Sequence, residues 1–226
     1  MGGMGAEYLS MLLETAASQE GVDFKVIVSD QSDDSEVEDV CGLYEFVEYH
    51  RFEGPRNPCD NLNHCISKSD ARVVKIMFQD DFFYPSKDSL LKCVEPILDG
   101  KCTWTASACL HTYDNGKTVS RPMIPRYHSQ IHMGVNTISS PSVVAFKRED
   151  DLNVTLFDPN ISLLLDVDWY KRMEYKHGLP FIVDSYNVVN RIHENSISNT
   201  ANKETEKVLL KEQEYIREKY ERTNIA

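Results

Sequence analysis

The sequence has no excess of positive charge. Its 226 residues include 36 acidic and 24 basic side chains, which gives a formal net charge of −12. Nucleic acids and anionic membrane surfaces attract proteins through a positive field, so this balance excludes both as general partners. An anionic ligand would need a metal ion or a local basic cluster to offset the repulsion. We therefore expect no nucleic-acid partner.

Long apolar runs and paired cysteines are absent too. Without a run of about 18 apolar residues we expect no transmembrane segment, and the amino end lacks the basic-then-apolar pattern of a secretory signal. The six cysteines show neither a CxxC pair nor zinc-ligand spacing, which is typical of reduced core thiols. These absences predict a soluble protein of the cytoplasm.

Common nucleotide-binding and hydrolase motifs are missing as well. There is no GxGxxG, Walker loop, HExxH or GxSxG, so dehydrogenase, ATPase, zinc protease and α/β-hydrolase functions have no support. The chain does hold 41% hydrophobic residues, enough for a sizeable core. We expect one domain over residues 1–200, followed over 201–226 by an amphipathic helix that packs on the domain or extends from it.

Helical and strand patterns alternate along the chain. Apolar β-branched runs at 24–30, 44–52 and 73–78 predict buried strands, and amphipathic segments at 7–19, 59–69 and 86–98 predict helices. Further strands are expected at 103–113, 142–147 and 179–194, and a helix at 163–178. This alternation favours an α/β fold with a mostly parallel sheet flanked by helices. Ligands of such sheets bind at the carboxyl ends of the strands.

Two adjacent acids stand at one of these strand ends. The stretch KIMFQDDFFYP, residues 75–85, predicts a strand that is followed at once by Asp80 and Asp81. A solvated loop or a helix cap would explain the pair. A divalent cation such as Mn²⁺ or Mg²⁺ is the functional alternative, because hard cations take carboxylate and phosphate oxygens together. Such a cation would also let an acidic protein hold a diphosphate.

Three more side chains are candidates for a site. Asp30 ends the strand at 24–30 and could accept hydrogen bonds from a base or ribose. Asp166 lies in the apolar run LLLDVD, where burial would raise its pKa toward that of a useful base; helix capping is the alternative. Asp168 follows two residues later and does not share a helix face with it. His193 follows a strand-like segment, where ordinary packing is the alternative.

Taken in order, these segments resemble the GT-A glycosyltransferases, particularly the inverting family-two type, from about residue 7 to residue 195. FKVIVSDQSDD is similar to the family's nucleotide-binding strand, which implies that Asp30 contacts the base. NLNHCISKSD places Asn63 at a family asparagine of the donor site. The doublet matches the DxD motif, which implies donor contacts for Asp80 and metal ligation for Asp81.

The second half of the chain continues the resemblance. LLLDVDWYKRM resembles the ED motif, which implies that Asp166 is the catalytic base, although Leu165 stands at the glutamate position. IHENSIS resembles the segment with a carboxyl-terminal histidine, which implies that His193 helps to hold the metal. The family's usual first strand has no counterpart ahead of the helix at 7–19, so the sheet is expected to lack it.

The resemblance implies a metal-dependent enzyme that uses Mn²⁺ or Mg²⁺. It would move a sugar with inversion from a UDP-, GDP- or dTDP-sugar to a hydroxyl of a glycan, lipid or protein acceptor. Two alternatives stay open. One is a sugar-phosphate nucleotidyltransferase, although MGGMGAEYL lacks the Arg or Lys of that class's phosphate loop. The other is a non-catalytic carbohydrate- or partner-binding module of the same fold, because the first strand would form part of the nucleotide pocket.

Overall fold

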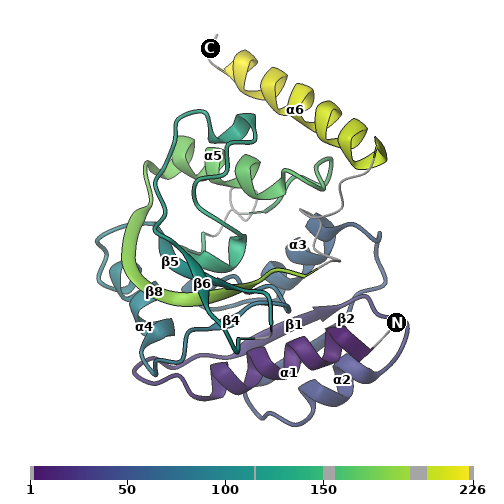
Figure 1. Ribbon diagram of the computed structural model, residues 1–226, viewed down its shortest axis with the longest axis vertical. Helices are drawn as coiled ribbons and strands as arrows, with labels where there is room; N and C mark the ends of the chain where they lie inside the picture. Colours follow the sequence, from purple (N-terminus) through teal and green to yellow (C-terminus); the bar gives the residue numbers. More distant parts are fainter. Residues whose placement is uncertain (1–2, 115, 150–155, 194–202, 224–226) are drawn as a thin grey trace.

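Two separate sheets run through the α/β fold of the computed structural model, which describes residues 3–114, 116–149, 156–193 and 203–223 (Figure 1). The smaller sheet is the parallel pair β1 (Val26–Asp30) and β2 (Val47–Arg51). The larger sheet has the order β3 (Val73–Lys75), β7 (Val144–Lys147), β5 (Trp104–Thr112), β8 (Phe181–Arg191) and β4 (Phe82–Phe83), with β6 (Ser120–Met123) also paired to β5. The expected α/β class is therefore confirmed.

The expectation of a mostly parallel sheet is wrong for the larger sheet. Within the described residues, β5 and β8 are its parallel pair, whereas the pairs β3–β7, β4–β8, β5–β6 and β5–β7 are antiparallel. The reason lies in residues 103–147, which supply three strands without a crossover helix between them. Parallel neighbours need such a crossover, whereas antiparallel neighbours do not. The long strand β8 lies within this sheet, between β5 and β4, and is strongly curved (Figure 1).

Helices cover the sheets on both sides. They are α1 (Gly3–Ala17), α2 (Glu36–Cys41), α3 (Pro58–Lys68), α4 (Ser89–Leu98), α5 (Leu165–His177) and α6 (Lys203–Thr223). One apolar cluster joins α1, α2 and α4, and a larger one joins α3, α5 and α6 to the larger sheet. No helix in the described part of the chain has the length and apolar character needed to cross a membrane.

The segment after β3 brings the acidic doublet into the middle of the molecule. The predicted strand at 73–78 ends early, at Lys75, and a turn follows at residues 79–80. The chain then joins the opposite edge of the larger sheet as β4, where Phe82 pairs with Val189. This crossing places Asp80 and Asp81 next to the carboxyl end of β8, a position that strand prediction alone does not give.

The carboxyl-terminal helix packs on the domain. In α6 the side chain of Ile216 is fully buried and Tyr220 is nearly so. Tyr220 donates a hydrogen bond from its hydroxyl to Oδ1 of Asp168 at 3.0 Å. The expected domain boundary near residue 200 lies outside the described residues. In the described residues α6 therefore contacts α5 through Tyr220 and Asp168.

Trp169 tests the larger core cluster. It is fully buried, and its ring lies 5.4 Å from that of Phe146 and 5.6 Å from that of Phe157, measured between centroids. Replacing a buried Trp by Ala removes apolar contacts and leaves a cavity, so Trp169→Ala should lower the free energy of unfolding by about 3–5 kcal/mol in urea titrations. Tyr175→Ala, at an exposed position of the same helix, is the control. Equal losses in the two variants would contradict this account of the core.

Candidate functional site

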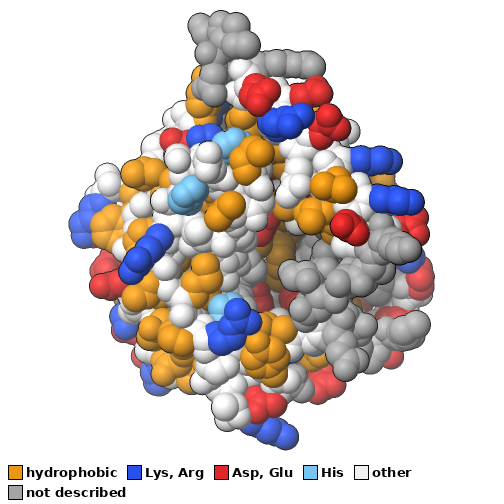
Figure 2. Space-filling view, turned by 45° about the horizontal axis from the view of Figure 1, so that its top comes forward, with side chains coloured by type: hydrophobic (Ala, Val, Ile, Leu, Met, Phe, Trp, Pro, Cys, Tyr) orange, Lys and Arg blue, Asp and Glu red, His pale blue; other side chains and the backbone are white. Residues whose placement is uncertain are grey.

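A cavity of about 1700 Å³ lies between the two sheets and reaches the start of α5. Pockets for small ligands usually measure about 300–1,000 Å³, so this cavity exceeds what one such ligand fills. Figure 2 shows a recess near the centre of the view, with acidic side chains inside it. The lining divides into an apolar part and a polar part, which have different origins.

The apolar part lies between two strand edges. Its walls include Ile27 of β1, Val74 of β3, Leu12 of α1 and Leu62 of α3. Among the described residues, β1 pairs with β2 alone and β3 pairs with β7 alone, so each strand leaves its second edge unpaired. This space therefore follows from the separation of the two sheets, and the site chemistry has to be sought in the polar part.

The acidic doublet lies in the polar part. Asp81 is almost fully buried, and its Oδ2 accepts hydrogen bonds from Oγ of Ser140 at 3.1 Å and from Nδ2 of Asn190 at 2.7 Å. Its Oδ1 accepts the backbone N–H of Arg191 at 2.9 Å. Burial, and then the neighbouring charge of Asp80, raise the pKa of Asp81. The carboxylate of Asp81 is thus fixed by three neutral donors, none of which brings a positive charge to it.

Arg191 brings a positive charge close to the doublet without neutralising it. Its guanidinium donates to the backbone carbonyl of Asp80 and stacks on the ring of Tyr8, with 4.0 Å between Cζ and the ring centroid. It also lies over Phe82, with 5.3 Å between Cζ and that ring's centroid. The ion-pair partner that the described residues give the doublet is His193, whose Nε2 lies 3.1 Å from Oδ2 of Asp80. Arg191 therefore holds the backbone of the doublet in place, and its guanidinium forms no ion pair with either carboxylate among the described residues.

Asp166 lines the same cavity from the first turn of α5. Nδ2 of Asn136 donates to its Oδ2 at 2.5 Å, and the backbone N–H of Val167 donates to its Oδ1 at 2.7 Å. Burial raises the pKa of Asp166 to about 6, although these hydrogen bonds oppose the shift. Asp168 is fully buried and binds α6 instead, as expected for two positions that do not share a helix face.

One loop connects Asp166 with Asp81. Nδ2 of Asn136, which holds Asp166, also donates to the carbonyl oxygen of Ser139 at 2.9 Å. Oγ of Ser139 donates to Oδ1 of Asn190 at 3.1 Å, and Asn190 in turn donates to Asp81. Ser139 has a φ of 102°, a costly conformation for a residue other than glycine, and such strain is concentrated at functional sites. The two acids therefore belong to one hydrogen-bonded floor.

Asp30 also lines the cavity, but its carboxylate is already engaged. Its Oδ2 accepts the hydroxyl of Tyr49 at 2.9 Å and that of Ser32 at 2.8 Å, and it lies 3.2 Å from a guanidinium nitrogen of Arg51. Its Oδ1 accepts the backbone N–H of Ser32 at 2.8 Å. In this arrangement the carboxylate of Asp30 holds the end of β1 in place. It has few free lone pairs left to accept hydrogen bonds from a nucleotide base.

Asn63 lies apart from these residues, since it is not among those that line the cavity. Its side-chain amide donates to the carbonyl of Phe157 at 2.8 Å and accepts the N–H of that residue at 2.6 Å. Asn61, two positions earlier on α3, does line the cavity and hydrogen-bonds Ser29 of β1. The structure thus brings Asp30, Asp80, Asp81, Asp166 and His193 to one cavity and leaves Asn63 outside it.

A divalent cation fits this site if water or a phosphate supplies some of its ligands. The protein side chains alone would not complete its coordination. No three His, Cys, Asp or Glu side chains in the described ranges are arranged to hold a metal ion on their own. Mg²⁺ and similar ions, however, are usually held by one or two carboxylates, with water and phosphate as the other ligands. Asp80 and His193 are only partly buried and lie next to the buried charge of Asp81, which a cation would stabilise.

Sequence reasoning missed four neutral or basic residues of the site: Asn136, Ser140, Asn190 and Arg191. Asn190 and Arg191 follow an apolar run at a strand end, the same signal that marked Asp30, so they could have been found. Asn136 and Ser140 lie in the long segment between β6 and β7, where sequence position gives no indication of which side chains turn inward.

Comparison with known proteins identifies solved structures that have a similar fold. No protein-family profile and no curated protein matches the sequence. Among solved structures, residues 1–349 of S. aureus TarS in complex with UDP-GlcNAc superpose with a TM-score of 0.65 at 17% identity, over 92% of this chain and 63% of that one. The mannosyltransferase PcManGT from Pyrobaculum calidifontis, in complex with GDP-Man and Mn²⁺, gives 0.61 at 16% identity, over 84% and 55%.

The fold is similar to that of the GT-A glycosyltransferases. At such low identities the likeness shows the fold alone, and this chain spans less than two thirds of the length of either neighbour.

The raised pKa of Asp166 predicts a pH-dependent stability. The folded state holds this proton more tightly than the unfolded state does, so the contribution of Asp166 to stability falls as pH rises from about 4 to about 6. Asp166→Asn should therefore be more stable than the parent at pH 7, by roughly 1–3 kcal/mol, with the difference vanishing near pH 4. Urea unfolding at several pH values measures this. Asp184→Asn, at an exposed position of β8, is the control. A difference independent of pH would show that Asp166 titrates normally.

Proposed function

We propose that this chain transfers a sugar from a nucleotide-sugar donor to an acceptor hydroxyl, with inversion, in the polar part of the cavity. The observation that carries the proposal is the hydrogen-bonded floor that joins Asp166 to Asp81. It brings a candidate base and a candidate diphosphate site into one cavity, and the fold similarity to TarS and PcManGT supports the assignment. The donor class follows from those neighbours, so a UDP-sugar and a GDP-sugar are the first candidates.

The donor diphosphate is assigned to the side of the cavity formed by the doublet. Asp80 and His193, which are partly exposed, would hold Mn²⁺ or Mg²⁺ together with the diphosphate, while Asp81 adds buried charge. This differs from the motif, which gives the metal to Asp81, because three donors already occupy that carboxylate. When bound, the cation would stabilise the negative charge that develops on the leaving diphosphate.

Asp166 is assigned the role of general base. Its carboxyl is mostly ionised at neutral pH, yet with a pKa of about 6 it is a stronger base than an ordinary aspartate. It would take the proton of the acceptor hydroxyl while that oxygen bonds to the anomeric carbon. The bond from this carbon to the phosphate oxygen breaks on the opposite side, and the nucleoside diphosphate leaves. Asn136 fixes the orientation of the base through its 2.5 Å contact.

Removing the base should slow turnover strongly and leave donor binding nearly unchanged. Asp166→Asn keeps the shape of the side chain and cannot take a proton, so the transfer rate should fall by about 10²–10⁴-fold, while the Kd for the donor changes little. The assay is release of UDP or GDP from a panel of sugar nucleotides with Mn²⁺. Unaltered turnover in the variant would remove Asp166 from this role. A parent protein that binds donor and never turns over would favour the non-catalytic module.

The doublet should make donor binding depend on the cation. In Asp80→Asn, calorimetric binding of UDP or GDP in the presence of Mn²⁺ should weaken by at least about tenfold, because the exposed carboxylate of the proposed site is lost. Asp33→Asn, at a highly exposed loop position, is the matched control and should bind as the parent does. If both variants bind the nucleotide like the parent, or if chelation of the metal has no effect, the cation site is wrongly placed.

A further inference from the structure

Glu212 of α6 is a buried carboxylate with an unusual set of partners. One of its oxygens, Oε1, accepts the backbone N–H and the hydroxyl of Ser162, both at 2.7 Å. The other, Oε2, accepts the backbone N–H groups of Leu163 and Leu164, both at 2.9 Å. Glu212 itself is only 6% exposed. One side chain thus ties down the whole turn that leads into α5.

This turn sets the direction in which Asp166 points. The helix α5 begins at Leu165, directly after the three residues that Glu212 holds, and Asp166 is its second residue. Ser162 and Leu163 line the cavity together with Asp166. Backbone N–H groups at the start of a helix have no partner within the helix, so an outside acceptor has to satisfy them and restrains the chain there. Glu212 is that acceptor for the residues just before α5.

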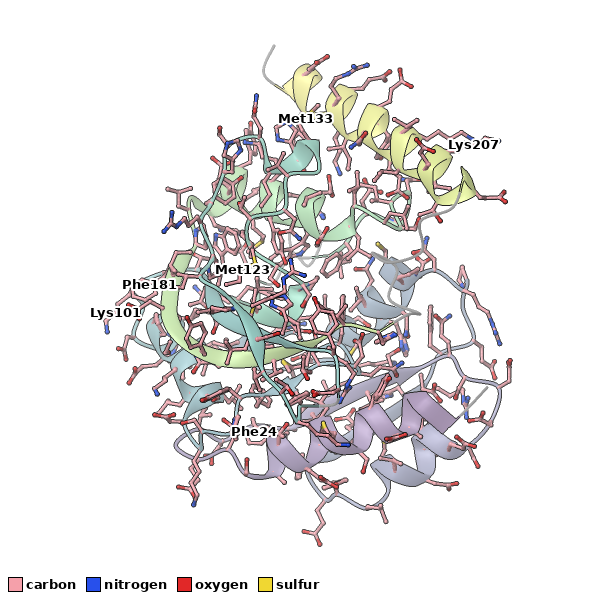
Figure 3. All side chains as sticks on the ribbon, viewed as in Figure 1. Phe24, Lys101, Met123, Met133, Phe181 and Lys207 are labelled. Atoms are coloured by element: carbon pink, nitrogen blue, oxygen red, sulfur yellow. The ribbon has the colours of Figure 1, made fainter. Side chains whose placement is uncertain are left out.

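The same helix also supports the second contact of Asp166. The 3-10 helix η1 (Ile131–Met133) lies beside α6, and Met133 is labelled there in Figure 3. In this region the ring of His132 packs against that of Tyr220, with 5.3 Å between their centroids. Asn136, which holds Oδ2 of Asp166, follows η1 by three positions. One face of α6 therefore contacts both segments that fix the carboxyl of Asp166.

We propose that Glu212 is a positioning residue for Asp166, an inference that rests on the function proposed above. By fixing the turn at residues 162–164 it holds the carboxyl of Asp166 inside the cavity, where burial keeps it basic. Asp168 gives α6 a second, separate anchor through Nζ of Lys219 at 2.8 Å and the hydroxyl of Tyr220. Because of that anchor, loss of Glu212 should loosen the turn without releasing the helix.

The test compares Glu212→Gln with Glu214→Gln, an exposed glutamate on the same helix. Glutamine has one acceptor oxygen where the carboxylate has two, so part of the turn loses its partner. With Glu212→Gln, kcat should fall by about 10–100-fold with KM for the donor nearly unchanged, as expected when a catalytic group is misplaced by about 1 Å. Glu214→Gln should behave like the parent.

A second readout separates positioning from general stability. The Asp166 carboxyl is followed by carbon-13 NMR across a pH titration, with its signal assigned from its absence in Asp166→Asn. In Glu212→Gln the pKa of Asp166 should move from its raised value toward about 4, the ordinary value of an aspartate. An unchanged pKa together with unchanged kcat would overturn the proposal. If no transfer activity exists at all, the NMR titration still decides the role of Glu212.

Ser162→Ala covers the case in which Glu212→Gln fails to fold. It removes one of the four hydrogen bonds and leaves Glu212 charged and buried. The pKa of Asp166 should then shift in the same direction by a smaller amount, and kcat should fall a few-fold. A folded Ser162→Ala protein with the parent's titration curve and kcat would count against the proposal.

Discussion

The burial of Asp81 is the constraint around which the site is organised. A carboxylate that leaves water needs donors, and Asp81 takes one from the backbone of β8, one from Asn190 and one from Ser140. These bonds fix the crossing segment against the end of β8, and they fix the loop that carries Ser140 as well. Since all three donors are neutral, they hold the group in place without cancelling its charge. The same interaction therefore builds the cavity floor and keeps a buried carboxylate in it.

Asp166 shows the other consequence of burying acids in this floor. Its pKa is raised because the surrounding protein solvates the charge less well than water does, which costs folding stability at neutral pH. The loop that reaches Asp166 includes Ser139 in a strained backbone conformation. Strain and charge burial at one place are tolerated when the rest of the fold over-determines the geometry. Here the additional constraints come from the large apolar cluster around Trp169 and from the two sets of hydrogen bonds that hold α6.

Local sequence signals predicted the elements and the acids but not their arrangement. The strand-end rule is correct for Asp30, which ends β1, whereas Asp80 and Asp81 reach the same cavity through the crossing from β3 to β4. Strand order is not visible in the sequence. The antiparallel pairs β5–β6 and β5–β7 follow from the lack of crossover helices in residues 103–147. The hydrogen bond between Ser162 and Glu212 joins residues that lie 50 positions apart. Asn63 matches a family asparagine in the sequence, but it does not line the cavity. A match in sequence does not tell which side of a helix faces the cavity.

The charge of the site bears on the proposed binding of a nucleotide-sugar donor independently of the fold similarity. Asp80, Asp81 and Asp166 line one cavity of a chain with a net charge of −12, and a nucleotide diphosphate brings further negative charge to it. Arg191 is committed to a backbone carbonyl and to aromatic rings, and its guanidinium has no ion-pair contact with either acid of the doublet among the described residues. Repulsion between like charges in a partly buried site is weakly screened by salt. A cation that entered together with a diphosphate would reduce this repulsion beside the doublet.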